Sequence, residues 1–221
     1  MTPAWKFALV VLILLLVNAV PGLVVPPDIW LPWRVISWML TIAMLLLALA
    51  IVGTRMTRDW RGVLVDRRNV MSMSRLQLVM WTVVIVSAIL TSGIANVAAG
   101  ATDPLLLKVP PEIWALLGIS GTAFVATPII LDHSATQIST NGGPEWAWAD
   151  IFLGDKVNND DKIDLSKVQQ FFFTVIVIAI YTMKLGYALA TAEKVEFPQI
   201  DPGFVAILGI SNAAYLIHKA S

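Results

Sequence analysis

Runs of apolar residues about as long as a lipid bilayer is thick are the feature that most constrains this chain. A helix that crosses the hydrocarbon core needs about 20 mostly apolar residues. Six segments have that character: 7–25, 33–53, 76–98, 112–131, 168–190 and 203–219. Since 57% of the residues are hydrophobic and only 14% are charged, a water-soluble domain could not bury the apolar surface, whereas lipid contact allows it. The sequence therefore predicts an all-α, polytopic helical membrane protein with about six transmembrane helices.

The first of these segments also has the features of a signal peptide. Lys6 precedes an apolar run over residues 7–17, and residues 17–19 would pass as a cleavage site. We expect the segment to be retained as a transmembrane helix with a break at Pro21-Gly22.

Basic residues are concentrated between the second and third segments, and this asymmetry predicts the orientation. Lysine and arginine favour cytoplasmic loops. The stretch at 55–75 holds Arg55, Arg58, Arg61, Arg67, Arg68 and Arg75. If this side faces the cytoplasm, then both termini and the loop at 132–167 face it too. We therefore expect a multi-pass protein of the cell membrane with cytoplasmic termini.

The same basic stretch is the candidate contact surface. The residues expected there are Arg55, Arg58, Trp60, Arg61, Arg67, Arg68, Arg75 and, before the fifth segment, Lys167. Contact with anionic lipid headgroups follows from charge alone, and docking of a cytoplasmic protein partner is the alternative. The formal net charge of zero gives no reason to expect nucleic acid as a partner.

The last four segments repeat a pattern. Ser-Arg-Leu-Gln at 74–77 recurs as Ser-Lys-Val-Gln at 166–169, an offset of 92, and Leu-Gly-Ile-Ser at 117–120 recurs at 208–211, an offset of 91. Two matched helices in the same order indicate a parallel internal duplication of two-helix units, helices 3–4 and 5–6. Because each unit has an even number of spans, the copies share one orientation, which predicts a pseudo-two-fold axis along the membrane normal.

The duplication also predicts how the chain is organised. The expected regions are transmembrane helices 1–2 at 1–54, a basic linker at 55–75, a first repeat at 76–131, a cytoplasmic loop at 132–167 and a second repeat at 168–221.

The repeated residues have structural interpretations. Ser74 with Gln77, and Ser166 with Gln169, fit the capping-box pattern at a helix start. Small and polar residues in the second helix of each unit favour close helix packing, and a pore or substrate path is the alternative. These residues are Gly118, Ser120, Thr122, Gly209, Ser211 and Asn212.

The loop at 132–167 predicts two local structures. Residues 145–153 have the pattern of a short amphipathic helix on the inner membrane surface. An acidic turn follows, with Asp155, Asn158, Asp160 and Asp164. A calcium site is the alternative there, but its register would put lysines where an EF-hand loop needs carboxylates, so we expect a solvated polar turn and no metal.

What the sequence lacks directs the functional hypotheses. There is no cysteine, no glycine-rich nucleotide motif and almost no charge within the apolar segments, which argues against an enzyme, a cofactor or a proton-coupled pump. The first hypothesis is a non-enzymatic, homo-oligomeric membrane protein that anchors or scaffolds a partner. The alternative is a passive ion channel or small-molecule transporter, with a path between the repeats or at the oligomer centre.

Overall fold

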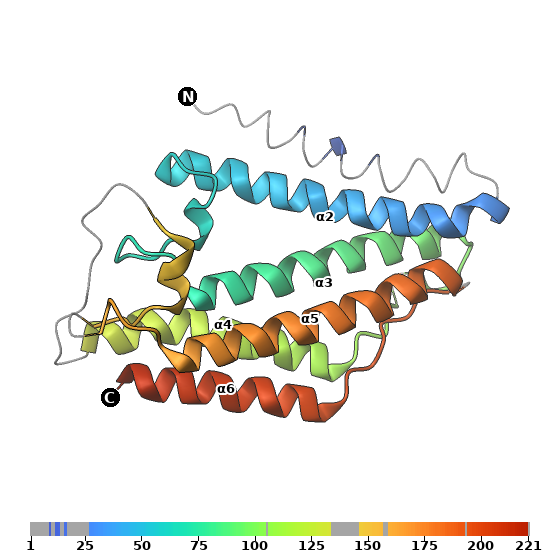
Figure 1. Cartoon of the computed structure of the whole chain (residues 1–221). Coiled ribbons are helices and arrows are strands. Elements are labelled where there is room, and N and C mark those ends of the chain that lie inside the picture. The colour runs from blue at the N-terminus through green and yellow to red at the C-terminus, as the bar shows by residue number, and fades with distance from the viewer. Residues whose placement is uncertain are drawn as a thin grey trace.

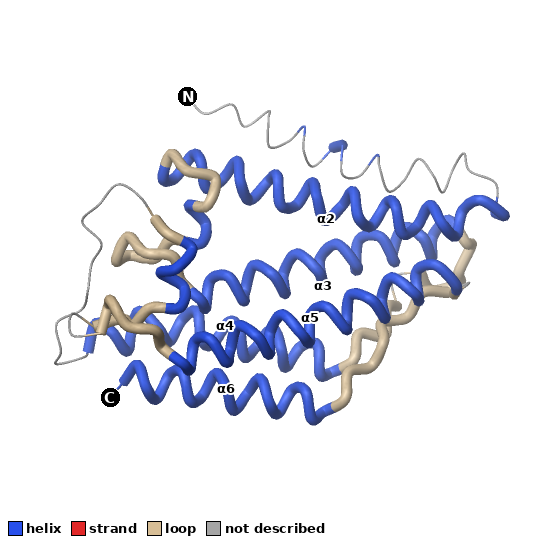
Figure 2. The backbone as a smooth tube through the Cα atoms, viewed as in Figure 1, coloured by secondary structure: helices blue, strands red, loops and turns tan. Residues whose placement is uncertain are grey.

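The computed structural model describes residues 27–104, 106–133, 146–156, 159–192 and 194–220, together with four isolated positions before residue 17. Five long helices make up this part of the chain, joined by loops and two short 3-10 helices (Figures 1 and 2). The helices are α2 (Pro27–Thr57), η1 (Gly62–Leu64), α3 (Met73–Ala98), α4 (Pro111–His133), η2 (Trp148–Phe152), α5 (Leu165–Thr191) and α6 (Pro202–Ala220). The first predicted transmembrane helix, at 7–25, lies outside the described residues apart from those isolated positions.

Four of the described helices are long and apolar enough to cross a membrane. They comprise residues Trp33–Thr57, Met73–Ala98, Pro111–Ile130 and Leu165–Thr191. The prediction of a helical membrane protein is therefore confirmed. The shorter α6, at 19 residues, is not among the four, and a total of six spans stays a prediction.

The helices α3 to α6 form a bundle in which neighbours follow a simple order. The helices α3 and α5 run in one direction and α4 and α6 in the other (Figure 1). Contacts link α3 to α4, α4 to α6, α6 to α5 and α5 to α3, and α2 packs across α3 and α5. A two-fold axis along the bundle would set α3 diagonally opposite α5. Because α3 instead lies beside α5, and α4 beside α6, the two hairpins are displaced sideways, and the predicted pseudo-two-fold axis is wrong.

The centre of the bundle is filled by large apolar side chains. Trp38, Trp81, Leu185 and Leu208 are fully buried and belong to one continuous cluster that joins α2, α3, α5 and α6. The indole of Trp38 donates a hydrogen bond of 2.9 Å to Ser87 Oγ, so its polar atom has a partner, as is usual for a buried tryptophan.

The two ends of the bundle differ in how the chain is folded. Residues 58–72, 146–156 and 159–164 and the end of α6 lie together at one end, which we call the basic end, and residues 99–104, 106–110 and 194–201 lie at the other (Figure 1). The basic end has its own small hydrophobic cluster, formed by Leu64, Val65, Met71, Met73 and Ile151. The basic end is therefore a folded cap with a core of its own.

Residues 148–152 contribute to this cap as a 3-10 helix. The amphipathic helix predicted at 145–153 is wrong in type, because η2 has five residues and its Ile151 is 2% exposed, packed into the small cluster rather than facing the membrane surface.

The segments that precede α3 and α5 have the same order of local elements. The helix η1 is followed by an antiparallel bridge between Val65 and Met71, and η2 by one between Leu153 and Ile163. In both cases the long helix begins two residues after the bridge. A 3-10 helix and an antiparallel bridge therefore precede both α3 and α5 in the same order.

The predicted capping boxes are wrong, because both helices begin earlier than expected. The N-cap of α3 is Ser72 rather than Ser74, and its side chain makes no capping hydrogen bond. The N-cap of α5 is Asp164, whose carboxylate accepts from the backbone N–H groups of Ser166 and Lys167. A carboxylate at this position is favoured by the helix dipole. Gln77 is buried in the bundle, and Gln169 is exposed.

The turn between α2 and η1 depends on a close backbone approach at Gly53. A Cβ atom at this position would lie 2.7 Å from the carbonyl oxygen of Trp60 and 3.0 Å from the amide nitrogen of Gly62. Both contacts are with backbone, which cannot rotate away. We expect Gly53→Ala to destabilise the fold by about 1–3 kcal/mol, as overpacking does, and to lower the melting temperature measured in detergent.

The matched control is Gly118→Ala in the exposed face of α4, where an added Cβ meets nothing within 4 Å. This change should leave stability equal or raise it by about 0.5–1 kcal/mol, since alanine favours a helix. Equal melting temperatures for Gly53→Ala and the unmodified protein would contradict the close approach.

Candidate functional site at the basic end

The buried carboxylate of Asp155 organises the charges of the basic end. Its side chain is paired with three cations: Arg68 Nη1 lies 2.6 Å from Oδ1, Lys167 Nζ 2.9 Å from Oδ1, and Lys219 Nζ 2.9 Å from Oδ2. Asp155 is 6% exposed, and the three cations are 9%, 3% and 4% exposed in that order. We call these four residues the Asp155 cluster.

The members of the Asp155 cluster come from four separate segments. Arg68 lies in the loop before α3, Asp155 follows the bridge residue Leu153, and the two lysines occupy the first turn of α5 and the last turn of α6. Lys167 Nζ also donates to the carbonyl of Leu153. The cluster therefore ties both cap loops to the ends of two bundle helices.

A second carboxylate, that of Asp66, holds the Arg68 side chain in position. Asp66 accepts from the backbone N–H of Arg68 at 2.8 Å and pairs with its guanidinium at 2.8 Å. With Asp66 included, three cations face two anions, so the group keeps one excess positive charge.

The electrostatic balance favours the ionised forms of Asp155 and Arg68. Burial alone would raise the pKa of Asp155, but the charges of Lys219, Lys167 and Arg68 outweigh it and hold the pKa well below its usual range. Burial would likewise lower the pKa of Arg68, yet Asp155 and Asp66 raise it. The carboxylate and the guanidinium are therefore charged at every physiological pH.

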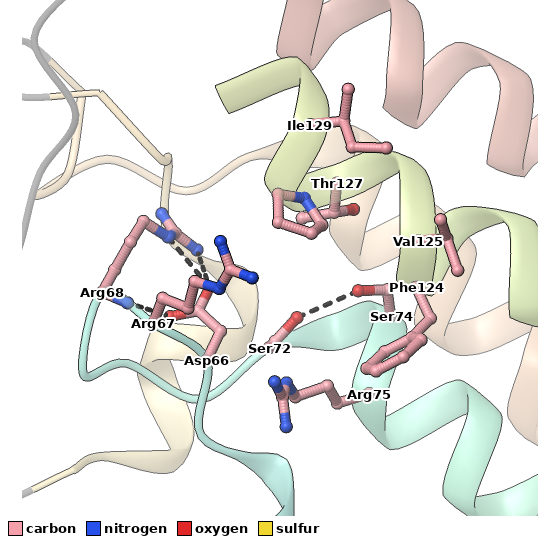
Figure 3. Close-up of a pocket in the computed structure, with 11 residues that line it drawn as sticks. Asp66, Arg67, Arg68, Ser72, Ser74, Arg75, Phe124, Val125, Thr127 and Ile129 are labelled. Carbon is pink, nitrogen blue, oxygen red and sulfur yellow. Dashed lines mark hydrogen bonds and ion pairs between the residues drawn. The ribbon is translucent and has the colours of Figure 1, made fainter. Parts of the chain in front are cut away.

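A cavity of about 330 Å³ adjoins this cluster, between the loop before α3 and the last turns of α4 (Figure 3). Arg67 and Arg68 lie on one side of it and α4 side chains on the other. Its full lining is Asp66, Arg67, Arg68, Ser72, Ser74, Arg75, Phe124, Val125, Thr127, Pro128 and Ile129.

Arg75 closes the cavity on the side of the first turn of α3. Its guanidinium carbon lies 5.3 Å from the centre of the Phe124 ring, and Nη1 donates to the carbonyl of Val63 at 3.4 Å. Ser72 and Ser74 share a hydrogen bond of 3.0 Å between their hydroxyls. Guanidinium groups and hydroxyls of this kind bind phosphate oxygens.

The residues predicted as an inner contact surface fall into two groups. Arg55, Arg58, Trp60 and Arg67 are exposed, as a contact surface requires. The others are engaged inside the protein: Arg61 pairs with Asp59 at 2.7 Å and donates to the Trp146 carbonyl, Arg75 packs on Phe124, and Arg68 and Lys167 belong to the Asp155 cluster.

The calcium alternative does not fit the acidic turn. Asp155 is surrounded by three cations, which would repel a metal ion, and Asp164 caps α5. Asp160 is partly buried in the turn, and Asn158 lies outside the described residues.

The small and polar residues predicted for packing or a path separate by face. Gly118 and Thr122 lie on the exposed face of α4. Gly209 of α6 faces α4, since a Cβ added to it would lie 3.7 Å from Cδ1 of Ile119. Ser120 is fully buried and donates to the Leu116 carbonyl. Ser211 and Asn212 are buried, each at 3% exposure.

Asn212 belongs to a polar network inside the bundle that the sequence did not reveal. Gln170 Nε2 donates at 2.7 Å to both Gln77 Oε1 on α3 and Asn212 Oδ1 on α6. Asn212 Nδ2 in turn donates to the Leu208 carbonyl at 3.0 Å. Within the described residues, several polar atoms beside this network have no hydrogen-bond partner: Gln77 Nε2, Gln170 Oε1, Thr174 Oγ1 and Ser211 Oγ.

Lys219 is a site residue that sequence reasoning missed. The sequence places it at the end of a helix, and Tyr215, four residues earlier on the same face, is the signal that could have found it. The Lys219 Nζ contacts the Tyr215 hydroxyl and lies 4.6 Å from the centre of that ring.

Comparisons with models of known protein families, with curated proteins and with solved structures find no match. The function is therefore inferred from the residues of this chain and their geometry.

The Asp155 cluster predicts a large cost for removing its carboxylate. Asp155→Asn leaves three buried cations without their common counter-charge, and breaking such a pair costs about 3–5 kcal/mol. We expect a strongly lowered melting temperature at neutral pH. Because the folded pKa of Asp155 is depressed, its contribution is complete above the unfolded pKa of about 3.9 and is lost as pH falls below that value, so the variant should also lose this part of the acid dependence.

The matched control is Asp161→Asn, an exposed position in the same turn. Its free energy of unfolding should lie within about 0.5 kcal/mol of that of the unmodified protein, as is usual for surface substitutions. Equal destabilisation by both variants, or an unchanged acid profile for Asp155→Asn, would contradict the proposed role of the cluster.

Proposed function

We propose that this protein is a non-enzymatic membrane anchor that oligomerises in the cell membrane and presents its basic end to a partner. The observation that carries the proposal is the folded cap, which has its own hydrophobic cluster and is tied to α5 and α6 through Asp155. A chain that only crossed the bilayer would need no more than short connections between its helices. A rigid extramembrane surface is what recognition of a partner requires, because little ordering entropy is then lost on binding.

The cap surface offers aromatic and basic side chains for such a contact. Trp60 is 58% exposed and Trp148 48% exposed, with ring centres 6.3 Å apart. Arg55 and Arg58 are exposed nearby on the same chain segment. Tryptophan and arginine are the residues most enriched at the energetic centres of protein interfaces.

The parallel duplication is part of the same proposal. The matched order of 3-10 helix, bridge and long helix before α3 and before α5 supports a repeat that begins earlier than residue 76. The common direction of α3 and α5, and of α4 and α6, supports it as well (Figure 1). We further propose six spans with both termini in the cytoplasm, in line with the arginines at the basic end.

The scaffold proposal predicts an assembly that depends on the two cap tryptophans. Native mass spectrometry in mild detergent should detect oligomers or a bound partner with the unmodified protein. The Trp60→Ala, Trp148→Ala double variant should lose that assembly at least in part, because two large exposed anchors are removed. Trp114→Ala is the control, since Trp114 is similarly exposed at 53% but lies at the other end of the bundle. A lone monomer for the unmodified protein would contradict the proposal.

A passive channel or transporter is the second candidate. The observation that favours it is the buried polar network of Gln77, Gln170 and Asn212, with unpaired polar atoms around it. Buried unpaired groups are costly unless water or a passing solute satisfies them.

The channel candidate predicts flux through reconstituted liposomes. Ion or solute leak should exceed that of empty vesicles, and Gln170→Leu should reduce it by removing the donor shared by Gln77 and Asn212. Thr82→Leu, at an exposed position of α3, should not reduce it. The same leak in empty vesicles, across several ions and small solutes, would contradict a channel.

A further inference from the structure

The cavity beside α4 carries an excess of positive charge. Its lining contains three arginines and one aspartate, and that aspartate, Asp66, is already paired with Arg68. The neighbouring Asp155 cluster adds two lysines against one further carboxylate. A partly enclosed space with this balance attracts an anion, and the attraction is stronger there than in open water.

The donors around the cavity suit a phosphate group. Arg67 and Arg75 present planar guanidinium groups, and the hydroxyls of Ser72 and Ser74 lie between them and α4 (Figure 3). Arginine forms two parallel hydrogen bonds to phosphate oxygens, which lysine cannot do. A volume of about 330 Å³ is at the lower end of the range for small-ligand sites, about 300–1,000 Å³.

The opposite wall is apolar and faces outward. Val125 and Ile129 line the cavity and are 56% and 54% exposed. Both belong to α4, which is one of the helices suited to cross the membrane. The ligand that fits these two walls has an anionic head and an apolar tail.

The exposed face of α4 continues from the cavity toward the middle of the helix. Positions 129, 125, 122 and 118 recur at helical spacing on one face, and all four are exposed. At Gly118 there is open space where a Cβ would stand. The side chains at 118 and 122 are small and exposed, so this face has room for an acyl chain to lie along it.

From these observations we propose that the cavity binds the phosphate of an anionic membrane lipid, with Arg67 and Arg75 as the phosphate ligands and an acyl chain along the exposed face of α4. This site is more specific than general attraction of a basic surface to headgroups. It does not depend on the scaffold proposal, since a lipid can occupy it whether or not a protein partner binds the cap.

The test uses the full chain in nanodiscs of phosphatidylcholine alone and of a three-to-one mixture of phosphatidylcholine and phosphatidylglycerol. The unmodified protein should melt at a higher temperature in the mixture, because a ligand of the folded state stabilises it, and should retain phosphatidylglycerol in native mass spectrometry. The R67Q/R75Q double variant should retain at least tenfold less, since a single charge-assisted hydrogen bond already contributes about that factor, and should lose the shift in melting temperature.

The matched control is the R55Q/R58Q double variant, which removes the same charge from exposed positions at the same end. It should keep both the retained lipid and the shift. If R67Q/R75Q fails to fold, R67Q alone keeps the proposal testable, because Arg67 is exposed and its loss should still lower retention.

Three results would overturn the proposal. One is an equal melting temperature in the two nanodisc compositions. Another is equal loss of retained lipid in R67Q/R75Q and R55Q/R58Q, which would mean general surface attraction. The third is stabilisation of the protein in phosphatidylcholine by inorganic phosphate to the same extent as by phosphatidylglycerol, which would assign the cavity to a soluble anion.

Discussion

The ion pairs of Asp155 are the interaction on which the basic end depends. One carboxylate that is almost inaccessible to solvent holds Arg68, Lys167 and Lys219 within 2.9 Å. Such a group is costly to assemble from water and is retained only where its geometry is fixed. By joining two loops to the ends of α5 and α6, it converts connections that could have been mobile into one folded cap.

This arrangement explains where the chain places its polar chemistry. The spanning helices carry apolar side chains outward, and the bundle centre is closed by Trp38, Trp81 and Leu185. The Asp155 cluster and the exposed Trp60 and Trp148 lie at the basic end, beside a cavity with a basic wall and an apolar wall. A surface that recognises a partner and a site that holds an anionic lipid can therefore be neighbours on the same rigid support.

The helices could be predicted from the sequence because their signal is local. A run of about 20 apolar residues is recognisable without knowledge of its neighbours in the fold, and the expected bounds of α3, α4 and α5 lie within three residues of the observed ones. The Asp155 cluster could not be predicted, since its members are far apart along the chain and the same aspartate also suits a solvated turn. The capping-box prediction is wrong because α3 begins at Met73, so Ser74 is not its N-cap, and Gln77 accepts from Gln170 inside the bundle instead of reaching back to a cap.

The relation between the two hairpins was also beyond sequence reasoning. The sequence pattern predicts the direction of each hairpin but not the operation that relates the two, and a sideways displacement satisfies the same pattern as a two-fold axis. Helix packing determines how the two hairpins are related, because α4 and α6 lie side by side, with Ile119 of α4 against Gly209 of α6.

The most direct test of the central claim is a double-mutant cycle between Asp155 and Lys219. Asp155→Asn, Lys219→Met and the double variant would be compared with the unmodified protein by the free energy of unfolding in one detergent. Direct pairing predicts a coupling energy of about 1–3 kcal/mol, with the double variant less destabilised than the sum of the single ones. Additivity within about 0.5 kcal/mol would show that the two side chains do not interact and would contradict the folded cap described above.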